Sequence, residues 1–146
     1  MKKLRGFTLI ELLMVIAIIG ILSSIVMVSL GSSKTKSRDA KRVSDIKQVQ
    51  TALELYYSDQ NGYPVMGQTG VLGVGLQCLG TGAFGVLGGT ACGGAYMGLI
   101  PSNPTPNGMA YTYGGASSSY TITFSIESGT GGLGVGAHTA TPSGVQ

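Results

Sequence analysis

The feature that most constrains this chain is an apolar run from Phe7 to Leu30. In these 24 residues the only ionisable side chain is Glu11. A bilayer hydrocarbon core is about 30 Å thick, and roughly 20 apolar helical residues cross it. A helix over this run would reach about 36 Å. Because the run is too apolar for a surface helix of a soluble domain, it predicts a membrane-spanning helix near the N-terminus.

A basic leader, residues 1–6, precedes the run. A secretory signal peptide opens in the same way, but its small-residue cleavage site follows an apolar stretch of about 7–15 residues. Here Ser23-Ser24 fits such a site poorly, and the conspicuous small residue, Gly6, comes before the run. Cleavage after Gly6 would leave the apolar helix on the mature chain. An uncleaved single-pass anchor is the alternative.

Glu11 is an unusual residue for a membrane helix. A carboxylate forced to the bilayer centre costs about 2.5–3.5 kcal/mol, so such residues usually have a partner and a function. Glu11 lies four residues after Phe7, one helical turn from the amine that cleavage after Gly6 would create. The alternative interpretation is that Glu11 only reaches back to the lipid headgroups.

The segment from Lys2 to Leu13, KKLRGFTLIELL, closely resembles the prepilin leader and N-terminal segment of type IV pilins and pseudopilins. In that family a membrane aspartic peptidase cuts after the glycine, and the new N-terminal phenylalanine is N-methylated. The resemblance implies that Gly6 is the cleavage residue, Phe7 the methylated N-terminus and Glu11 an acid that helps subunit assembly. The close resemblance covers roughly residues 2–64, and the remainder matches in general architecture.

Charged residues make up only 10 % of the chain, against roughly 25 % in an average soluble domain. The net charge of +3 belongs to the leader, whose removal leaves six basic against six acidic residues. We interpret the basic stretch from Lys34 to Lys47 as a solvated helix face. Nucleic-acid binding is unfavoured, because it calls for unopposed cations and exposed aromatic side chains.

After the apolar run the pattern becomes amphipathic. Residues 32–61 contain neither Gly nor Pro, and apolar residues recur there at steps of three and four: Val43, Ile46, Val49, Leu53 and Tyr56 or Tyr57. This spacing predicts a helix with one apolar stripe. Asn61-Gly62-Tyr63-Pro64 is a strong stop signal. We therefore expect one helix from Phe7 to Gln60.

Residues 62–98 hold 13 glycines, and no charge appears from Gln60 to Ile126. We expect a loop here, with a short strand near Val71–Leu76. Cys78 and Cys92 lie inside it, and a disulfide closing a loop of this length contributes roughly 3 kcal/mol. The alternative is two free thiols. A zinc site would need two ligands besides the cysteines, and His138 alone cannot supply both.

The last third of the sequence reads as β structure. Strands are predicted at Met109–Tyr113 and Tyr120–Ile126, with a turn at Gly114–Ser118 between them, and a third strand at Leu133–Thr139. Alternation places Ile122, Phe124 and Ile126 on one face of the second strand. That face can be buried against the apolar stripe of the helix.

These elements predict an α+β, pilin-like fold in which a long N-terminal helical spine packs on a small antiparallel sheet. We divide the chain into a leader (1–6), a transmembrane and assembly half of the spine (7–30) and an amphipathic half (31–61). A Gly-rich variable region (62–108) and a sheet with C-terminal tail (109–146) follow.

No catalytic set emerges from the sequence. His138 has no fixed acid partner, and Glu54, Asp59 and Glu127 are scattered. The serines at 117–119 lack a nucleophile-elbow pattern. Some secretion pseudopilins bind calcium through acids near the C-terminus, but only Glu127 follows residue 59 here, so no metal or cofactor is expected.

The resemblance implies the structural subunit of a type IV pilus, which forms a homo-oligomeric helical filament. The alternative is a pseudopilin of a type II secretion system or competence pseudopilus. Implied partners are prepilin peptidase, the assembly platform, minor pilins and the cytoplasmic membrane. Charge alone leaves the membrane orientation near a tie, because the stretch Lys34–Lys47 carries a net +4. The resemblance favours an N-in, C-out subunit before assembly and an extracellular filament afterwards.

Overall fold

The computed structural model describes residues 7–146, and all their side chains except that of Val28. One long helix, α1 (Leu9–Gln60), runs through two compact units that divide after Thr35. It begins two residues later than the expected Phe7 and ends where the Asn61-Gly62 stop signal predicts. The first unit contains the apolar part of α1. The second, Lys36–Gln146, contains the amphipathic part and all strands.

In the second unit, the apolar stripe of α1 is the helical half of a single core. Ile46, Val49 and Leu53 are almost completely buried, and Val43 and Tyr56 pack against them from the edges. Tyr57, the other residue considered for the end of the stripe, is 40 % exposed. The three- and four-residue spacing therefore identified the buried face.

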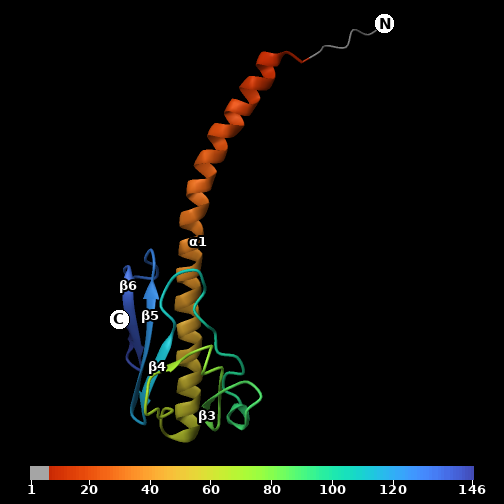
Figure 1. The fold of residues 1–146 in the computed structure, drawn as a ribbon. Helices are drawn as coiled ribbons and strands as arrows, with labels where there is room; N and C mark the ends of the chain where they lie inside the picture. Colours follow the sequence, from red (N-terminus) through yellow and green to blue (C-terminus); the bar gives the residue numbers. More distant parts are fainter. Residues whose placement is uncertain (1–6) are drawn as a thin grey trace. The chain divides into compact units, whose positions relative to one another are not determined.

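The stripe packs against a five-stranded antiparallel sheet (Figure 1). The strand order is β1–β4–β5–β6–β7. The strands are β1 (Gly70–Val71), β4 (Thr112–Ala116), β5 (Ser119–Ile126), β6 (Gly136–Thr141) and β7 (Gly144–Val145). Ile122, Phe124 and Ile126 are buried on one face of β5, as their alternation predicts. The α+β, pilin-like fold class is confirmed.

The boundaries of β4 differ from the prediction. The strand starts at Thr112 and continues through Gly114 and Gly115, and the turn is confined to Ser117-Ser118. A Gly pair normally signals a turn. Here the missing side chain serves packing, because a Cβ at Gly115 would collide with the Tyr113 hydroxyl and the Pro64 carbonyl.

The third predicted strand is also displaced. β6 covers Gly136–Thr141, while Leu133 lies in a tight turn that exchanges backbone hydrogen bonds with Thr130. Gly131 and Gly132 close this turn with φ values of 59° and 85°, which favour glycine. The edge strand β7 was not predicted.

The Gly-rich region is more ordered than the sequence suggests. Its strand near Val71–Leu76 is reduced to β1, but it also holds a hairpin of β2 (Cys78–Gly80) and β3 (Ala83–Gly85) and a 3-10 turn, η1 (Thr90–Cys92). A disulfide joins Cys78 to Cys92. Gly80 permits the close approach of β2 to the backbone around η1, since a Cβ at Gly80 would meet the carbonyl oxygens of Ala91 and Gly93.

Candidate functional site

The described residues of the first unit present an apolar surface. Every described side chain from Phe7 to Lys34 is exposed, including the large apolar ones of α1 up to Leu30. The helix is long and apolar enough to cross a membrane. The apolar side chains of such a helix need to be covered by lipid or by other helices.

Glu11 closes a reciprocal cap at the start of α1. Its carboxylate oxygen Oε2 accepts hydrogen bonds from the backbone N–H of Thr8 (2.8 Å) and from the Thr8 hydroxyl (2.6 Å). The Glu11 N–H donates back to the Thr8 hydroxyl oxygen at 3.3 Å. This is the Thr-x-x-Glu capping box, in which two otherwise unpaired helix donors find partners. The second carboxylate oxygen of Glu11 has no such role in the cap.

The structure places the other predicted residues as follows. Phe7 is 77 % exposed and lies just before the helix. Gly6 lies outside the described residues. Cys78 and Cys92 are brought together in the second unit, in a part of the chain separate from the N-terminal motif.

A cluster of buried charges, which we call the ion cluster (Arg38, Asp39, Arg42 and Glu127), joins α1 to the end of β5. Arg42 has no exposed side-chain surface. Its guanidinium donates to Asp39 Oδ1 at 2.8 Å and pairs with Glu127. It also donates to the loop that precedes β4, at Asn103 Oδ1 (2.7 Å), the Pro104 carbonyl (3.1 Å) and the Asn107 carbonyl.

Asp39 holds the other side of the same cluster. It accepts hydrogen bonds from the backbone N–H groups of Glu127 (2.9 Å) and Ser128 (2.7 Å) and from the Ser128 hydroxyl (2.8 Å). Burial raises the pKa of Asp39. These hydrogen bonds and the one from Arg42 lower it by more than burial raises it, so the pKa lies below its usual range. Asp39 therefore stays ionised and fixes the exit of β5.

Glu127 completes the cluster. Arg38 donates to both of its oxygens, at 3.1 and 2.8 Å. This bidentate bond is the main reason that the pKa of Glu127 falls to about 2, with Arg42 and Asn107 adding to it and burial opposing it. The cluster is a structural clamp between segments that are far apart in sequence.

The ion cluster corrects one sequence interpretation. The stretch Lys34–Lys47 is not simply a solvated face, because Asp39 and Arg42 in it are completely buried. A signal was present in the sequence, since the spacing of the apolar stripe, continued backwards from Ile46 in steps of four and three, falls on Arg42 and Asp39. Glu127, alone after a long uncharged segment, was the other signal.

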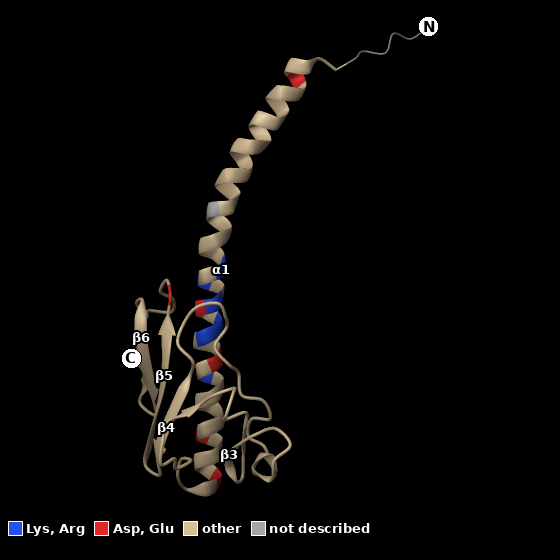
Figure 2. Ribbon diagram, in the orientation of Figure 1, with Lys and Arg blue, Asp and Glu red and all other residues tan. Residues whose placement is uncertain are grey.

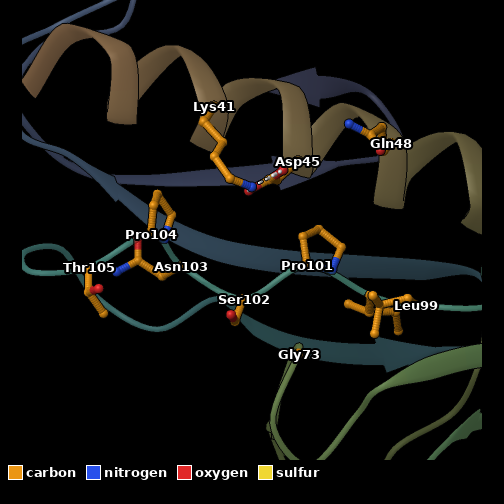
Figure 3. Close-up of a pocket in the computed structure, with 11 residues that line it drawn as sticks. Lys41, Asp45, Gln48, Gly73, Leu99, Pro101, Ser102, Asn103, Pro104 and Thr105 are labelled. Carbon is orange, nitrogen blue, oxygen red and sulfur yellow. Dashed lines mark hydrogen bonds and ion pairs between the residues drawn. The ribbon is translucent and has the colours of Figure 1, made fainter. Parts of the chain in front are cut away.

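A groove of about 700 Å³ lies between α1 and the loop that includes Leu99–Thr105 (Figure 3). Lys41 and Asp45 are the charged residues that line it, and they pair with each other at 3.2 Å. Asp45 also accepts a hydrogen bond from the Tyr111 hydroxyl. Within residues 7–146, no group of three or more His, Cys, Asp and Glu side chains is placed to hold a metal ion.

Comparisons with known proteins agree with the N-terminal motif. A family model described as the prokaryotic N-terminal methylation motif matches residues 1–27. Type II secretion system core protein G of Vibrio cholerae is 33 % identical over 138 residues, which is 94 % of this chain and 90 % of that protein. No solved structure matches the chain significantly.

Other relatives match over shorter lengths. Core protein G of Escherichia coli is 46 % identical over 66 residues, under half of either chain. Type IV major pilin protein PilA of Myxococcus xanthus is 37 % identical over 59 residues, 40 % of this chain and 27 % of that protein. These proteins are structural subunits and not enzymes. With the near full-length match to the Vibrio cholerae protein, the motif, the exposed apolar helix and the helix-on-sheet core show that the chain belongs to the type IV pilin and pseudopilin family.

Proposed function

We propose that this chain is a pseudopilin of a type II secretion system, the subunit of a short filament that drives export. The observation that carries this choice is the similarity to core protein G along 94 % of the chain, compared with 40 % for the type IV pilin. This similarity favours a secretion pseudopilin, the alternative in the sequence analysis, over the type IV pilus subunit that the resemblance of the N-terminal segment first implied.

In this proposal, prepilin peptidase cuts after Gly6, and Phe7 becomes the N-methylated terminus. The subunit initially spans the cytoplasmic membrane with its N-terminus inside and residues 36–146 outside. Assembly then moves the apolar helix from lipid into a bundle of sister helices. The exposed apolar surface from Phe7 to Leu30 supports this step, because either environment covers it.

Glu11 would set the register of that bundle. Once its carboxylate leaves the headgroup region, it requires a positive partner, and the amine of Phe7 on an adjacent subunit supplies one. The Thr8 cap supports this role, because it holds one oxygen of Glu11 and leaves the other for a neighbour. An unpaired buried charge would cost about 3–5 kcal/mol.

The decisive experiment is deletion of the gene followed by complementation. A pseudopilin deletion should abolish secretion of exported proteins into the medium while surface pili persist, and the intact gene should restore secretion. Mass spectrometry of the assembled subunit should find a methylated Phe7 as the first residue. Normal secretion in the deletion strain would contradict the proposal, and recovery of Met1 would contradict the processing.

The second candidate is a type IV pilin, which the match to the Myxococcus xanthus pilin supports over the N-terminal part. The same deletion distinguishes the two. Loss of surface filaments with normal secretion would identify a pilin and place the assembled subunit outside the cell. Peptide mapping of sheared filaments would confirm that this chain is their subunit.

A further inference from the structure

The exposed charges of the second unit are confined to one helix. Among residues 36–146, every charged side chain except the largely buried Glu127 lies on α1, and the other strands and loops are uncharged (Figure 2). The charges along α1 are also ordered. Cations lie in the first part of this segment, and the last two charges are the acids Glu54 and Asp59.

Two of the cations in residues 36–146 have no partner among the residues that the structure describes. Lys36 and Lys47, which we call the cationic segment, are exposed and make neither an ion pair nor a hydrogen bond through their side chains to any described residue. The other cations of α1 in residues 36–60 are paired with acids of the same chain: Arg38, Lys41 and Arg42. The cationic segment therefore presents uncompensated positive charge.

Glu54 and Asp59, which we call the acidic end, are exposed but held in place. The Tyr63 hydroxyl donates to Glu54 Oε1 at 2.9 Å, and the Tyr96 hydroxyl donates to Asp59 Oδ2 at 3.0 Å. Each bond uses one oxygen of a carboxylate, and neither acid pairs with a cation of its own chain among the described residues. The acidic end presents fixed negative charge.

We propose that the acidic end of one copy contacts the cationic segment of a neighbouring copy. This inference rests on the proposed function, because it concerns subunits that lie parallel in a filament. Parallel copies with no axial shift would place like charges side by side, which is unfavourable, whereas shifted copies bring opposite charges together. The charge order on α1 thus selects a staggered arrangement of the second units.

The geometry of a helix gives the contact a clear signature. At 1.5 Å per residue, Lys36 lies about 27 Å from Glu54 along α1, and Lys47 lies about 18 Å from Asp59. No single chain can bring either pair into direct contact. A covalent link between them therefore reports two copies.

The test treats membranes from cells that assemble the wild-type chain with a carbodiimide, which joins an amine directly to a carboxylate in contact with it. Peptide mass spectrometry should find Lys36 or Lys47 linked to Asp59, or Lys36 linked to Glu54. Subunits dispersed in detergent should give none of these links. Cells that secrete normally through this chain but give none of these links would overturn this inference and leave the proposed function intact, whereas normal secretion after deletion of the gene would overturn both.

Variants provide a second measurement. Glu54→Gln with Asp59→Asn keeps side-chain shape and the tyrosine hydrogen bonds, so thermal unfolding should be unchanged while the amount of exported protein in the medium falls about tenfold. Lys36→Gln with Lys47→Gln is the reciprocal variant and should give the same loss. Wild-type secretion by cells carrying either double variant would overturn the inference.

Discussion

Arg42 is the residue on which the second unit depends most visibly. It connects α1 to the loop before β4 and to the end of β5, and its charge is compensated by Asp39 and Glu127. A buried ion pair adds little stability compared with a well-packed apolar pair. Removal of one partner, however, leaves the other as an unpaired buried charge, which is strongly destabilising. The second unit is therefore sensitive to single substitutions in the ion cluster.

Arg42→Met should lower the free energy of unfolding by about 3–5 kcal/mol, because Asp39 is left as an unpaired buried charge. Tyrosine fluorescence during urea unfolding of the detergent-solubilised chain can measure this, as the protein has seven tyrosines and no tryptophan. Lys47→Met is the matched control. This exposed side chain makes no ion pair with a described residue, so the expected change is within about 0.5 kcal/mol. Equal losses in the two variants would contradict the role of the ion cluster.

Glu127 gives the fold a defined acid sensitivity. Its pKa of about 2 in the folded chain lies below the value of about 4.3 for an unfolded glutamate. The resulting stabilisation, at most about 3 kcal/mol, is complete above pH 4.3 and is lost as the pH falls toward 2. Urea unfolding at pH values from 6 to 2 should show this decline, and Glu127→Gln should flatten it. An identical slope in the variant would assign the acid sensitivity to other groups.

At the scale of elements, the Gly-rich region is organised by a covalent bond more than by a core. The hairpin of β2 and β3 is short, and it packs against η1 through glycines that leave little side-chain volume. The disulfide between Cys78 and Cys92 closes this arrangement. Because a glycine-rich segment has much conformational freedom to lose, restricting its unfolded state is an effective way to stabilise it.

Replacement of both cysteines, Cys78→Ser with Cys92→Ser, should lower the free energy of unfolding by roughly 3 kcal/mol. The same urea titration measures the loss, and limited proteolysis should show new cleavage between residues 78 and 92. Ser118→Ala, in the exposed turn between β4 and β5, is a control that should change neither readout. Unchanged stability of the double variant would show that hydrogen bonds alone hold the hairpin.

At the scale of the whole molecule, the subunit consists of an apolar part of α1 and a folded domain, residues 36–146. Glu11 belongs to the first and places one charge within its apolar surface, four residues after Phe7. Its position in the capping box means that a substitution acts on the start of α1 as well as on contacts with neighbours.

Glu11→Ala should leave prepilin cleavage intact while filaments disappear, because in the proposed order of events the peptidase acts before assembly, and the charge proposed to set the register is gone. Immunoblotting of membranes for processed subunit and electron microscopy of filaments measure the two steps. Thr8→Val, which removes only the side-chain half of the cap, should retain filaments. Unchanged filament formation with Glu11→Ala would refute the pairing between Glu11 and Phe7.

The sequence by itself determined the features that depend on neighbours along the chain. The apolar run, the stripe of Ile46, Val49 and Leu53 and the alternation in β5 are periodic patterns, and each led to the observed element. The stop at Asn61-Gly62 is equally local. The proposed cleavage and assembly residues Gly6, Phe7 and Glu11 lie close together in the sequence, so a short stretch was enough to propose them.

Only the tertiary structure decided the features that join distant segments. Arg38 bonds to a residue 89 positions away, and Arg42 to one 61 positions away, so no local pattern specifies the partners of these cations, although the spacing of the stripe falls on Arg42. The continuation of β4 through Gly115 likewise depends on Tyr113 and Pro64, which occupy the space that a side chain at Gly115 would need. Burial of charge and accommodation of glycine are set by what packs against a residue, and that becomes defined only when the chain has folded.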